Sequence, residues 1–237
     1  MTRPAFIVLL AFAAGWGLVR AWRARQDYAM DGTNVGGRRD LIGMAIQTPL
    51  FFLAVWFAWN EGALSRVLFA PAPWLLGLIA GHLIFAGSLL VTHGHLEDVI
   101  DVLSGPIRLA RFATGRFDLT LRTFAVAFTE ELIFREAAQR AVLHPWIGAV
   151  PGILVTAACF VAVHEHLFRN TPRGLVEFAG FALLLGVLYH ASDSLALVTA
   201  VHAARNLESS WLEEECGDSG QPDKVANHPV DAIHGTG

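Results

Sequence analysis

The sequence predicts an all-α protein, a polytopic bundle of about seven transmembrane helices. Hydrophobic residues make up 54% of the 237 residues, and the mean hydropathy is +0.47. Charged residues make up 16% of the chain, against about 25% in soluble domains. The apolar residues also gather into long runs, which arginines, prolines and polar clusters separate. Composition and run length together therefore predict a chain that crosses a bilayer several times.

Seven runs of the chain approach the roughly 20 apolar residues that cross a bilayer as a helix. The predicted spans cover residues 5–22, 41–59, 74–91, 119–143, 146–164, 174–191 and 194–211. We expect the first span to stay uncleaved rather than act as a signal peptide, because its apolar run continues to Trp22 before arginines end it. The first three spans are plain and hydrophobic, whereas the last four, although also hydrophobic, carry nearly all the polar residues inside spans.

Small and capping residues mark the later spans. Asp193 and Ser194 are the candidate N-caps of the seventh span, because short polar side chains accept hydrogen bonds from the first backbone N–H groups of a helix. Gly180 and Gly186 lie in the sixth span, where we expect them to let neighbouring helices approach closely.

The spans divide the chain into three predicted regions. Residues 1–118 hold the first three spans and a connection, 94–118, that breaks at Gly105 and mixes apolar with charged residues. That mixture predicts an amphipathic segment in the membrane interface. Residues 119–212 hold the four polar-bearing spans, and 213–237 form a polar tail with six of the 21 acidic residues. The tail lacks an apolar period and is predicted to be disordered.

The distribution of arginines predicts the orientation in the membrane. Five arginines lie in residues 20–40, three in 92–118 and two in 165–173, and the alternate connections hold few. Because basic residues favour cytoplasmic loops, we expect the N-terminus outside and the C-terminal tail in the cytoplasm. The sequence thus predicts a multi-pass integral protein of the plasma membrane, the inner membrane of a bacterium, with the lipid bilayer as a partner.

Charge and cysteine content exclude two classes of protein. The net charge is −4 and no basic stripe occurs, which argues against nucleic acid as a partner. The two cysteines are Cys159, in an apolar run, and Cys216, in the polar tail. Two such positions form neither a disulfide framework nor a cysteine metal site.

The fourth span carries adjacent acids in an apolar setting, where ionisable residues are costly and usually functional. Glu131 and Arg135 are four residues apart and can pair on one helix face. Glu130 lies about 100° round the helix from Glu131 and gains no partner on its own helix. An acid in such a setting can act as a general base. The alternative is that both acids lie at a helix end in water.

Polar residues also occur in the fifth and seventh spans. His164 ends 17 uncharged residues, and Phe160 lies one turn before it; alone, His164 would more often be an interfacial histidine than a catalyst. His202 and Asn206 are four apart, on one helix face. Such a pair can simply join helices by hydrogen bonding, but its occurrence alongside the acids and His164 favours a common site.

Three motifs occur in order on successive apolar segments: Glu130-Glu131-x-x-x-Arg135, Phe160-x-x-x-His164 and His202-x-x-x-Asn206. Each motif is weak alone, but the three in this order and layout are specific. With them, residues 120–211 resemble the CPBP family, the CAAX-protease and bacteriocin-processing (Abi-like) family of intramembrane proteases. Residues 1–118 and the tail contribute nothing to the resemblance.

The resemblance implies a glutamate-dependent intramembrane endopeptidase, with a conical catalytic cavity that opens within the membrane. It implies that Glu130 and His164 activate a water molecule. It also implies that His202 and Asn206 complete the site and stabilise the oxyanion of the tetrahedral intermediate. Glu131, Arg135 and Phe160 then support the site.

We expect no cofactor, because no compact trio of metal ligands occurs by spacing; a zinc site built from the glutamate and histidines is the less favoured alternative. The expected substrate is a membrane-associated protein or peptide, such as a C-terminal sorting signal or a lipid-modified tail. Two alternatives belong to other classes. One is a non-catalytic immunity or scaffold protein of the same fold, and the other is a proton-coupled transporter that uses the buried acids as a relay.

Overall fold

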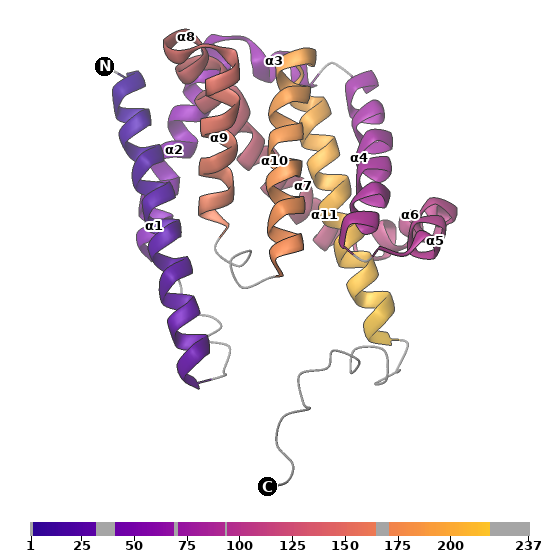
Figure 1. Cartoon of the computed structure of the whole chain (residues 1–237). Helices are drawn as coiled ribbons and strands as arrows, with labels where there is room; N and C mark the ends of the chain where they lie inside the picture. The colour runs from indigo at the N-terminus through magenta and orange to yellow at the C-terminus, as the bar shows by residue number, and fades with distance from the viewer. Residues whose placement is uncertain (1, 32–40, 69–70, 93, 165–170, 219–237) are drawn as a thin grey trace, which may run out of the picture.

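A computed structural model describes residues 2–31, 41–68, 71–92, 94–164 and 171–218. All regular elements in these ranges are helices, which confirms the predicted all-α class (Figure 1). In chain order they are α1 (Thr2–Asp31), α2 (Leu41–Asn60), α3 (Ala63–Leu68), α4 (Pro71–Thr92), α5 (Leu96–Ser104), α6 (Pro106–Gly115), α7 (Phe117–Glu131), η1 (Leu132–Leu143), α8 (His144–Ile147), α9 (Ala149–Val163), α10 (Pro172–Ser192) and α11 (Leu195–Asp218).

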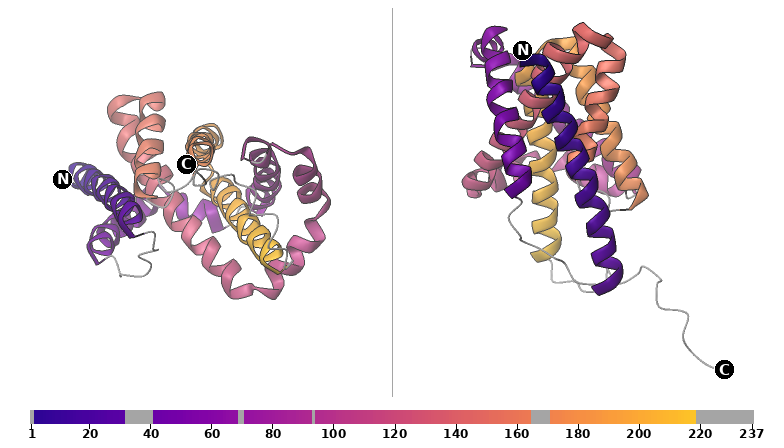
Figure 2. Two further views of the ribbon diagram at one scale, coloured as in Figure 1. Left: turned by 60° about the horizontal axis from the view of Figure 1, so that its bottom comes forward. Right: turned by 90° about the vertical axis from the view of Figure 1, so that its left-hand side faces the viewer.

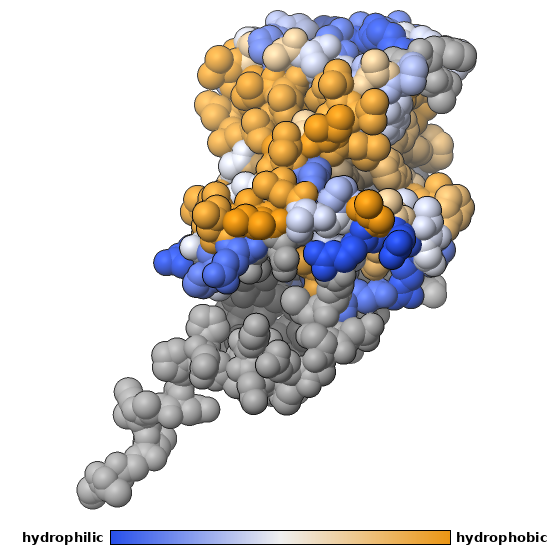
Figure 3. Space-filling view, turned by 90° about the vertical axis from the view of Figure 1, so that its right-hand side faces the viewer, coloured by the Kyte–Doolittle hydropathy of each residue, from blue (hydrophilic) through white to orange (hydrophobic). Residues whose placement is uncertain are grey.

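The long helices form a bundle with an apolar outer surface. Figure 3 shows a broad apolar belt between two bands of polar residues. By length and composition, four helical segments are able to cross a membrane, namely Arg3–Arg23, Leu41–Asn60, Pro71–Thr92 and Pro172–Ser192, and Ala149–Val163 is a shorter apolar helix. A membrane-spanning helix bundle is thereby confirmed, whereas the count of seven spans stays a prediction.

The described helix ends divide between the two ends of the bundle. The C-terminal ends of α1, α9 and α11 and the short helices α5 and α6 lie at one end of the bundle, the lower end in Figure 1. The helices α3 and α8 lie at the opposite end, with the N-terminus. The left view of Figure 2 shows α1 and α2 at one edge of the bundle and α4, α5 and α6 at the other.

The predicted fourth span differs from the single α-helix expected over 119–143. The α-helix α7 ends at Glu131, and η1 continues the same rod as a π-helix through Leu143. A π-helix is hydrogen-bonded with five-residue spacing and is frequent at functional sites. Arg135 and Glu136 lie four and five residues after Glu131, and Gln139 and Arg140 lie four and five residues after Arg135. The wider turn keeps this set on one side of the rod, and all but Arg140 are buried.

The amphipathic connection at residues 94–118 is present as α5 and α6, with Gly105 between them. Val99 and Val102 pack in a small cluster with Trp211 of α11. On α5, Ile100 and Leu103 remain exposed, as expected for helices that lie along an apolar surface.

One expectation about α11 needs correction, and one of its two candidate N-caps is confirmed. The predicted tail begins at residue 213, but α11 continues to Asp218; the rest of the predicted tail, 219–237, lies outside the described residues. Ser194 is the residue that caps α11, because its Oγ accepts a hydrogen bond from the Leu197 N–H at 3.2 Å. Asp193 instead ends α10 in the left-handed conformation, with φ at 46°.

Glycines allow close packing at some helix contacts but not at Gly180. A Cβ at Gly77 of α4 would lie 2.4 Å from the Leu197 carbonyl oxygen of α11, and one at Gly186 would lie 2.9 Å from Ile153. Gly186 therefore has the predicted packing role. The same prediction is wrong for Gly180, which is exposed, because a Cβ added there would meet no atom within 4 Å.

Candidate active site

Three helices bring Glu130, His164 and His202 together. Glu130 lies in the last turn of α7, His164 directly follows α9, and His202 lies in the first half of α11. The Nε2 atom of His164 lies 3.5 Å from one carboxylate oxygen of Glu130, and the Nε2 atom of His202 lies 3.6 Å from the other. The carboxylate of Glu130 thus meets two histidines that other helices supply.

The neighbouring acid fixes the orientation of His202. The Nδ1 atom of His202 lies 2.8 Å from Glu131 Oε1, and Glu131 Oε2 accepts a hydrogen bond from Arg135 Nε at 2.9 Å. Glu131 and Arg135 have 0% exposed side chains. The guanidinium of Arg135 balances the charge of the carboxylate, so Glu131 accepts the Nδ1–H of His202. This hydrogen bond leaves the Nε2 atom of His202 facing Glu130.

A backbone carbonyl fixes His164 in the same sense. The Nδ1 atom of His164 lies 2.7 Å from the carbonyl oxygen of Phe160. A carbonyl oxygen only accepts hydrogen bonds, so Nδ1 carries the proton. Both imidazoles therefore direct Nε2 at the carboxylate of Glu130. The arrangement can hold a proton between one carboxylate and two ring nitrogens. Such groups can act in general acid–base catalysis.

An aromatic wall surrounds the two histidines. The Phe160 ring centroid lies 4.5 Å from that of His164, and the rings of Phe178 and Phe181 on α10 lie 5.0 Å from His164 and 5.8 Å from His202, respectively. The rings lower the local polarity, which strengthens charge interactions inside the site.

Sequence reasoning missed the contribution of α10 to this wall. No site residue was predicted in the sixth span, yet the rings of Phe178 and Phe181 contact the histidines. Arg205 of α11 places its guanidinium 4.7 Å above the Phe181 ring and pairs with Glu177 at 2.7 Å. Glu177 and Phe181 are four residues apart and share a helix face. An acid and two aromatic residues close together on an apolar helix were the available signal.

Glu130 also borders a cavity of about 580 Å³. The cavity lies between α1, α2, α7, η1 and α9, and most of its wall is apolar. Neither His164 nor His202 lines it. Glu130 is 24% exposed and His202 is 2% exposed, so Glu130 stands between the open cavity and the enclosed histidines.

Asn206 is not joined to this cluster by a hydrogen bond. Its carbonyl accepts a hydrogen bond from Ser210 Oγ at 3.1 Å, but its side-chain amide bonds to none of the described residues. The four-residue spacing does place Asn206 on the same face of α11 as His202. The structure therefore brings together three of the four predicted catalytic residues.

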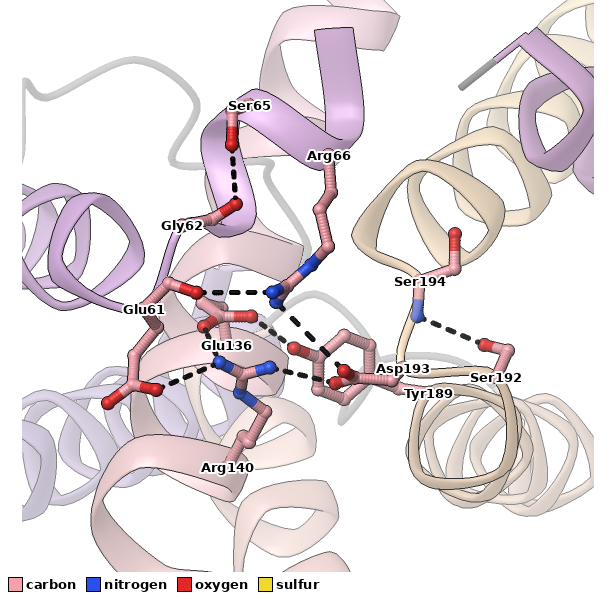
Figure 4. A network of polar contacts seen from close by, with 10 residues as sticks. All are labelled: Glu61, Gly62, Ser65, Arg66, Glu136, Arg140, Tyr189, Ser192, Asp193 and Ser194. Atoms are coloured by element: carbon pink, nitrogen blue, oxygen red, sulfur yellow. Dashed lines mark hydrogen bonds and ion pairs between the residues drawn. The ribbon is translucent and has the colours of Figure 1, made fainter. Parts of the chain in front are cut away.

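A second, partly buried polar cluster lies farther along η1, and sequence reasoning missed it as well (Figure 4). Arg140 pairs with Glu61 at 3.2 Å, Glu136 at 3.2 Å and Asp193 at 2.8 Å. Tyr189 donates a hydrogen bond to Glu136. The cluster joins η1 to α10 and to the segment between α2 and α3. The four-residue spacing of Glu136 and Arg140 was its sequence signal.

Within the described residues, no group of three or more His, Cys, Asp or Glu side chains is arranged to hold a metal ion. The predicted independence of metal stays a prediction.

Comparison with known proteins gives a family match over residues 113–207. This segment matches the family model of type II CAAX prenyl endopeptidase Rce1-like proteins. The match includes Glu130, Glu131, Arg135 and both histidines of the cluster, and it confirms the resemblance found from the three motifs. No curated protein and no solved structure matches the chain.

Proposed function

Because residues 113–207 match the Rce1-like type II CAAX prenyl endopeptidases, we propose that the protein is an intramembrane endopeptidase whose general base is Glu130. One observation carries this proposal. Glu130 is the member of the polar cluster that borders the 580 Å³ cavity, and it contacts both histidines at the same time. A group that meets the substrate space on one side and proton acceptors on the other is suited to move a proton during hydrolysis.

The reaction is a hydrolysis in which Glu130 takes a proton from a water molecule. The resulting hydroxide forms a bond to the carbonyl carbon of the scissile peptide bond, and the carbonyl oxygen becomes an oxyanion. The carbon–nitrogen bond then breaks, and the proton held by Glu130 passes to the leaving amine. His164, with Nε2 3.5 Å from Glu130, shares that proton and so supports the carboxylate as a base.

We assign the remaining residues to support of the charges that form. Glu131 and Arg135 hold His202 through its Nδ1 atom, and Phe160 holds His164 through its carbonyl oxygen. The role in oxyanion stabilisation that the family resemblance implies for His202 and Asn206 forms part of the proposal. An oxyanion gains most from donors fixed before the reaction. The bond to Glu131 fixes the ring of His202, and its Nε2 atom becomes such a donor when it carries the proton that Glu130 takes from the water molecule.

The proposed mechanism uses no metal ion or other cofactor. The proposed substrate is a membrane-associated protein, cut near a lipid-modified or apolar C-terminal tail. The apolar cavity wall, with Phe51, Phe52 and Phe134, suits such a tail. We further propose that the chain resides in the inner membrane of a bacterium with its C-terminus in the cytoplasm, from the arginines of the connections at that end.

The test measures cleavage by purified protein in proteoliposomes. One reporter is a fluorescence-quenched prenylated CAAX peptide, and the other carries an apolar segment followed by basic residues. We expect Glu130→Gln to lower kcat roughly 100- to 10,000-fold, the usual contribution of a general base. Glu61→Gln is the matched control, because Glu61 is half-exposed and lies in the second polar cluster; it should stay near wild type.

The competing classes predict other results. Full cleavage by a folded Glu130→Gln variant excludes the proposed mechanism. Proton-coupled flux in the same proteoliposomes, without cleavage of either reporter, favours a transporter. Absence of both activities favours a scaffold or immunity protein of this fold.

A further inference from the structure

A helix outside the family segment, α2, supplies five of the thirteen residues that line the cavity beside Glu130. Of its lining residues, Gln47, Thr48, Leu50, Phe51 and Phe52 come from α2, and the family match begins at residue 113. α2 packs against α1, α3 and η1 but makes little contact with α7. Phe52 of α2 is 65% exposed and Val126 of α7 is 51% exposed. The cavity therefore reaches the apolar outer surface between α2 and α7.

The cavity wall contains four polar side chains, and three of them have partners within the protein. Thr48 Oγ1 donates a hydrogen bond to the Met44 carbonyl at 2.7 Å, and Thr129 Oγ1 donates to the Ala125 carbonyl at 2.8 Å. Glu130 faces the two histidines. Gln47 is the fourth, and its amide makes no hydrogen bond with any residue that the structure describes.

Gln47 lies at the junction of two neighbouring cavities. Gln47 lines the 580 Å³ cavity and also a second cavity of about 30 Å³. The small cavity continues from Ala13 and Val163 toward Trp16 and Arg20, at the arginine-rich end of α1. Gln47 thus stands where the wide apolar space narrows toward a polar end of the bundle.

A substrate in this space needs partners for its main chain. A peptide bond becomes open to attack only where the chain is extended, because helical carbonyls are already hydrogen-bonded. An extended chain in an apolar cavity has lost water as well, and each unpaired N–H or C=O group then costs free energy. A primary amide offers both a donor and an acceptor, which matches the two polar groups of one peptide unit.

We propose that Gln47 is a positioning residue that hydrogen-bonds the main chain of a substrate held extended in the cavity beside Glu130. This inference rests on the proposed endopeptidase function. It assigns α2, a helix with no motif residue, the task of aligning the peptide bond with the base. Because the contact is to the main chain, it acts on substrates of different side-chain sequence.

The experiment combines a variant of Gln47 with changes in the reporter main chain. Gln47→Met removes the donor and acceptor and keeps an unbranched side chain. We expect it to raise KM about 3- to 10-fold, the usual effect of losing one hydrogen bond, with kcat near wild type. A set of reporters carries one ester each, in place of one of the peptide bonds next to the scissile bond. Each of these reporters therefore lacks one N–H group. One such ester should raise KM of the wild type by a similar factor and leave the KM of Gln47→Met unchanged.

The control is Asn60→Leu, because Asn60 also carries a primary amide on α2 but bonds to the Trp56 carbonyl of its own helix and does not line the cavity; its KM should match the wild type for every reporter. The inference is overturned if the effect of Gln47→Met on KM adds to the effect of every ester in the set. An unchanged KM for Gln47→Met with the all-peptide reporter overturns it as well. In either case an inactive Glu130→Gln variant still supports the proposed function. If the wild type cleaves no reporter, the proposed function fails. Fluorescence anisotropy of the same ester series then tests Gln47 by binding alone, and equal affinities for wild type and Gln47→Met overturn the inference.

Discussion

The two polar clusters along α7 and η1 contain similar residues but differ in the groups that face their carboxylates. The first contains Glu130 and Glu131 with Arg135, and the second contains Glu136 with Arg140. The first adds two histidines whose Nε2 atoms meet at Glu130. The second adds no histidine among the described residues; it joins Arg140 to three carboxylates and Glu136 to Tyr189. A cavity of about 360 Å³ borders this second cluster, so access alone does not distinguish the two.

What distinguishes them is whether the groups that face a carboxylate can exchange a proton with it. In the second cluster, arginine takes up the charge of the carboxylates, and arginine does not release its proton in proteins. In the first cluster, Arg135 takes up the charge of Glu131, whereas Glu130 faces two imidazoles, and an imidazole nitrogen can either accept or donate a proton. The comparison agrees with the proposed chemistry at the first cluster, whereas the second cluster joins η1 to α10 and to the segment between α2 and α3.

The largest expected effect on stability is at the buried pair of the first cluster. Arg135→Met leaves Glu131 charged and without its arginine, so the free energy of unfolding should fall by roughly 3–5 kcal/mol. Glu131→Gln combined with Arg135→Met leaves neither charge of the pair and should cost less than Arg135→Met alone. Denaturant unfolding in detergent measures both. A double variant less stable than the single would contradict this account of the pair.

A substitution in the second cluster should lower the free energy of unfolding by less, and it should leave the cleavage activity unchanged. Arg140→Leu removes the partner of three carboxylates, but Arg140 is 20% exposed and Tyr189 still bonds to Glu136. The free energy of unfolding should fall by roughly 1.5–3 kcal/mol. Activity per folded molecule should match the wild type in the reporter assay. A large loss of kcat in the folded variant would assign the second cluster a part in catalysis.

A substitution at Gly186, a helix contact between the two clusters, should change the stability less than Arg135→Met or Arg140→Leu. A methyl group at Gly186 would lie 2.9 Å from Ile153 and 3.1 Å from the Gln139 side chain, whose Nε2 donates to the Gly186 carbonyl. Overpacking costs roughly 1–3 kcal/mol, and the gain in helix propensity of about 1 kcal/mol offsets part of it. Gly186→Ala should therefore lower the melting temperature slightly. Gly180→Ala, in open space, should raise it or leave it unchanged; the reverse order of the two variants would show that the contact at Gly186 is loose.

No effect is expected from removal of divalent metal. The proposed base and its two histidines perform the proton transfers, so incubation with a chelator should leave the initial cleavage rate unchanged. The measurement compares chelated protein, untreated protein and chelated protein with zinc restored. Inhibition by the chelator that zinc reverses would replace the proposed mechanism with a metal-assisted one.

The parts of the site predicted from sequence depend on contacts within one helix. The pairing of Glu131 with Arg135 follows from a four-residue spacing, and the different direction of Glu130 follows from its adjacent position. The bond between His202 and Glu131 joins residues 71 apart, and no periodicity encodes it. The family resemblance brought His164 and His202 into one site, because their spacing along the chain carries no information on distance in space.

The fold shows the same division. Apolar run length predicted the long helices, since the bilayer sets a length that is visible in composition. The π-helix was not predictable, because no proline or glycine interrupts residues 132–143 and the backbone pattern depends on what packs around it. The extension of α11 to Asp218 was missed for a related reason, since Glu213 and Glu214 are good helix formers outside the membrane.

The π-helical form of η1 also affects how sequences of relatives should be compared. A π-type turn closes its hydrogen bond one residue farther along the chain than an α-type turn, so it accommodates one additional residue. A relative that keeps an α-helix here can hold the same two polar clusters only with a residue removed between them. A one-residue gap between Glu131 and Arg140 would then mark a change of helix type and leave the chemistry of both clusters intact.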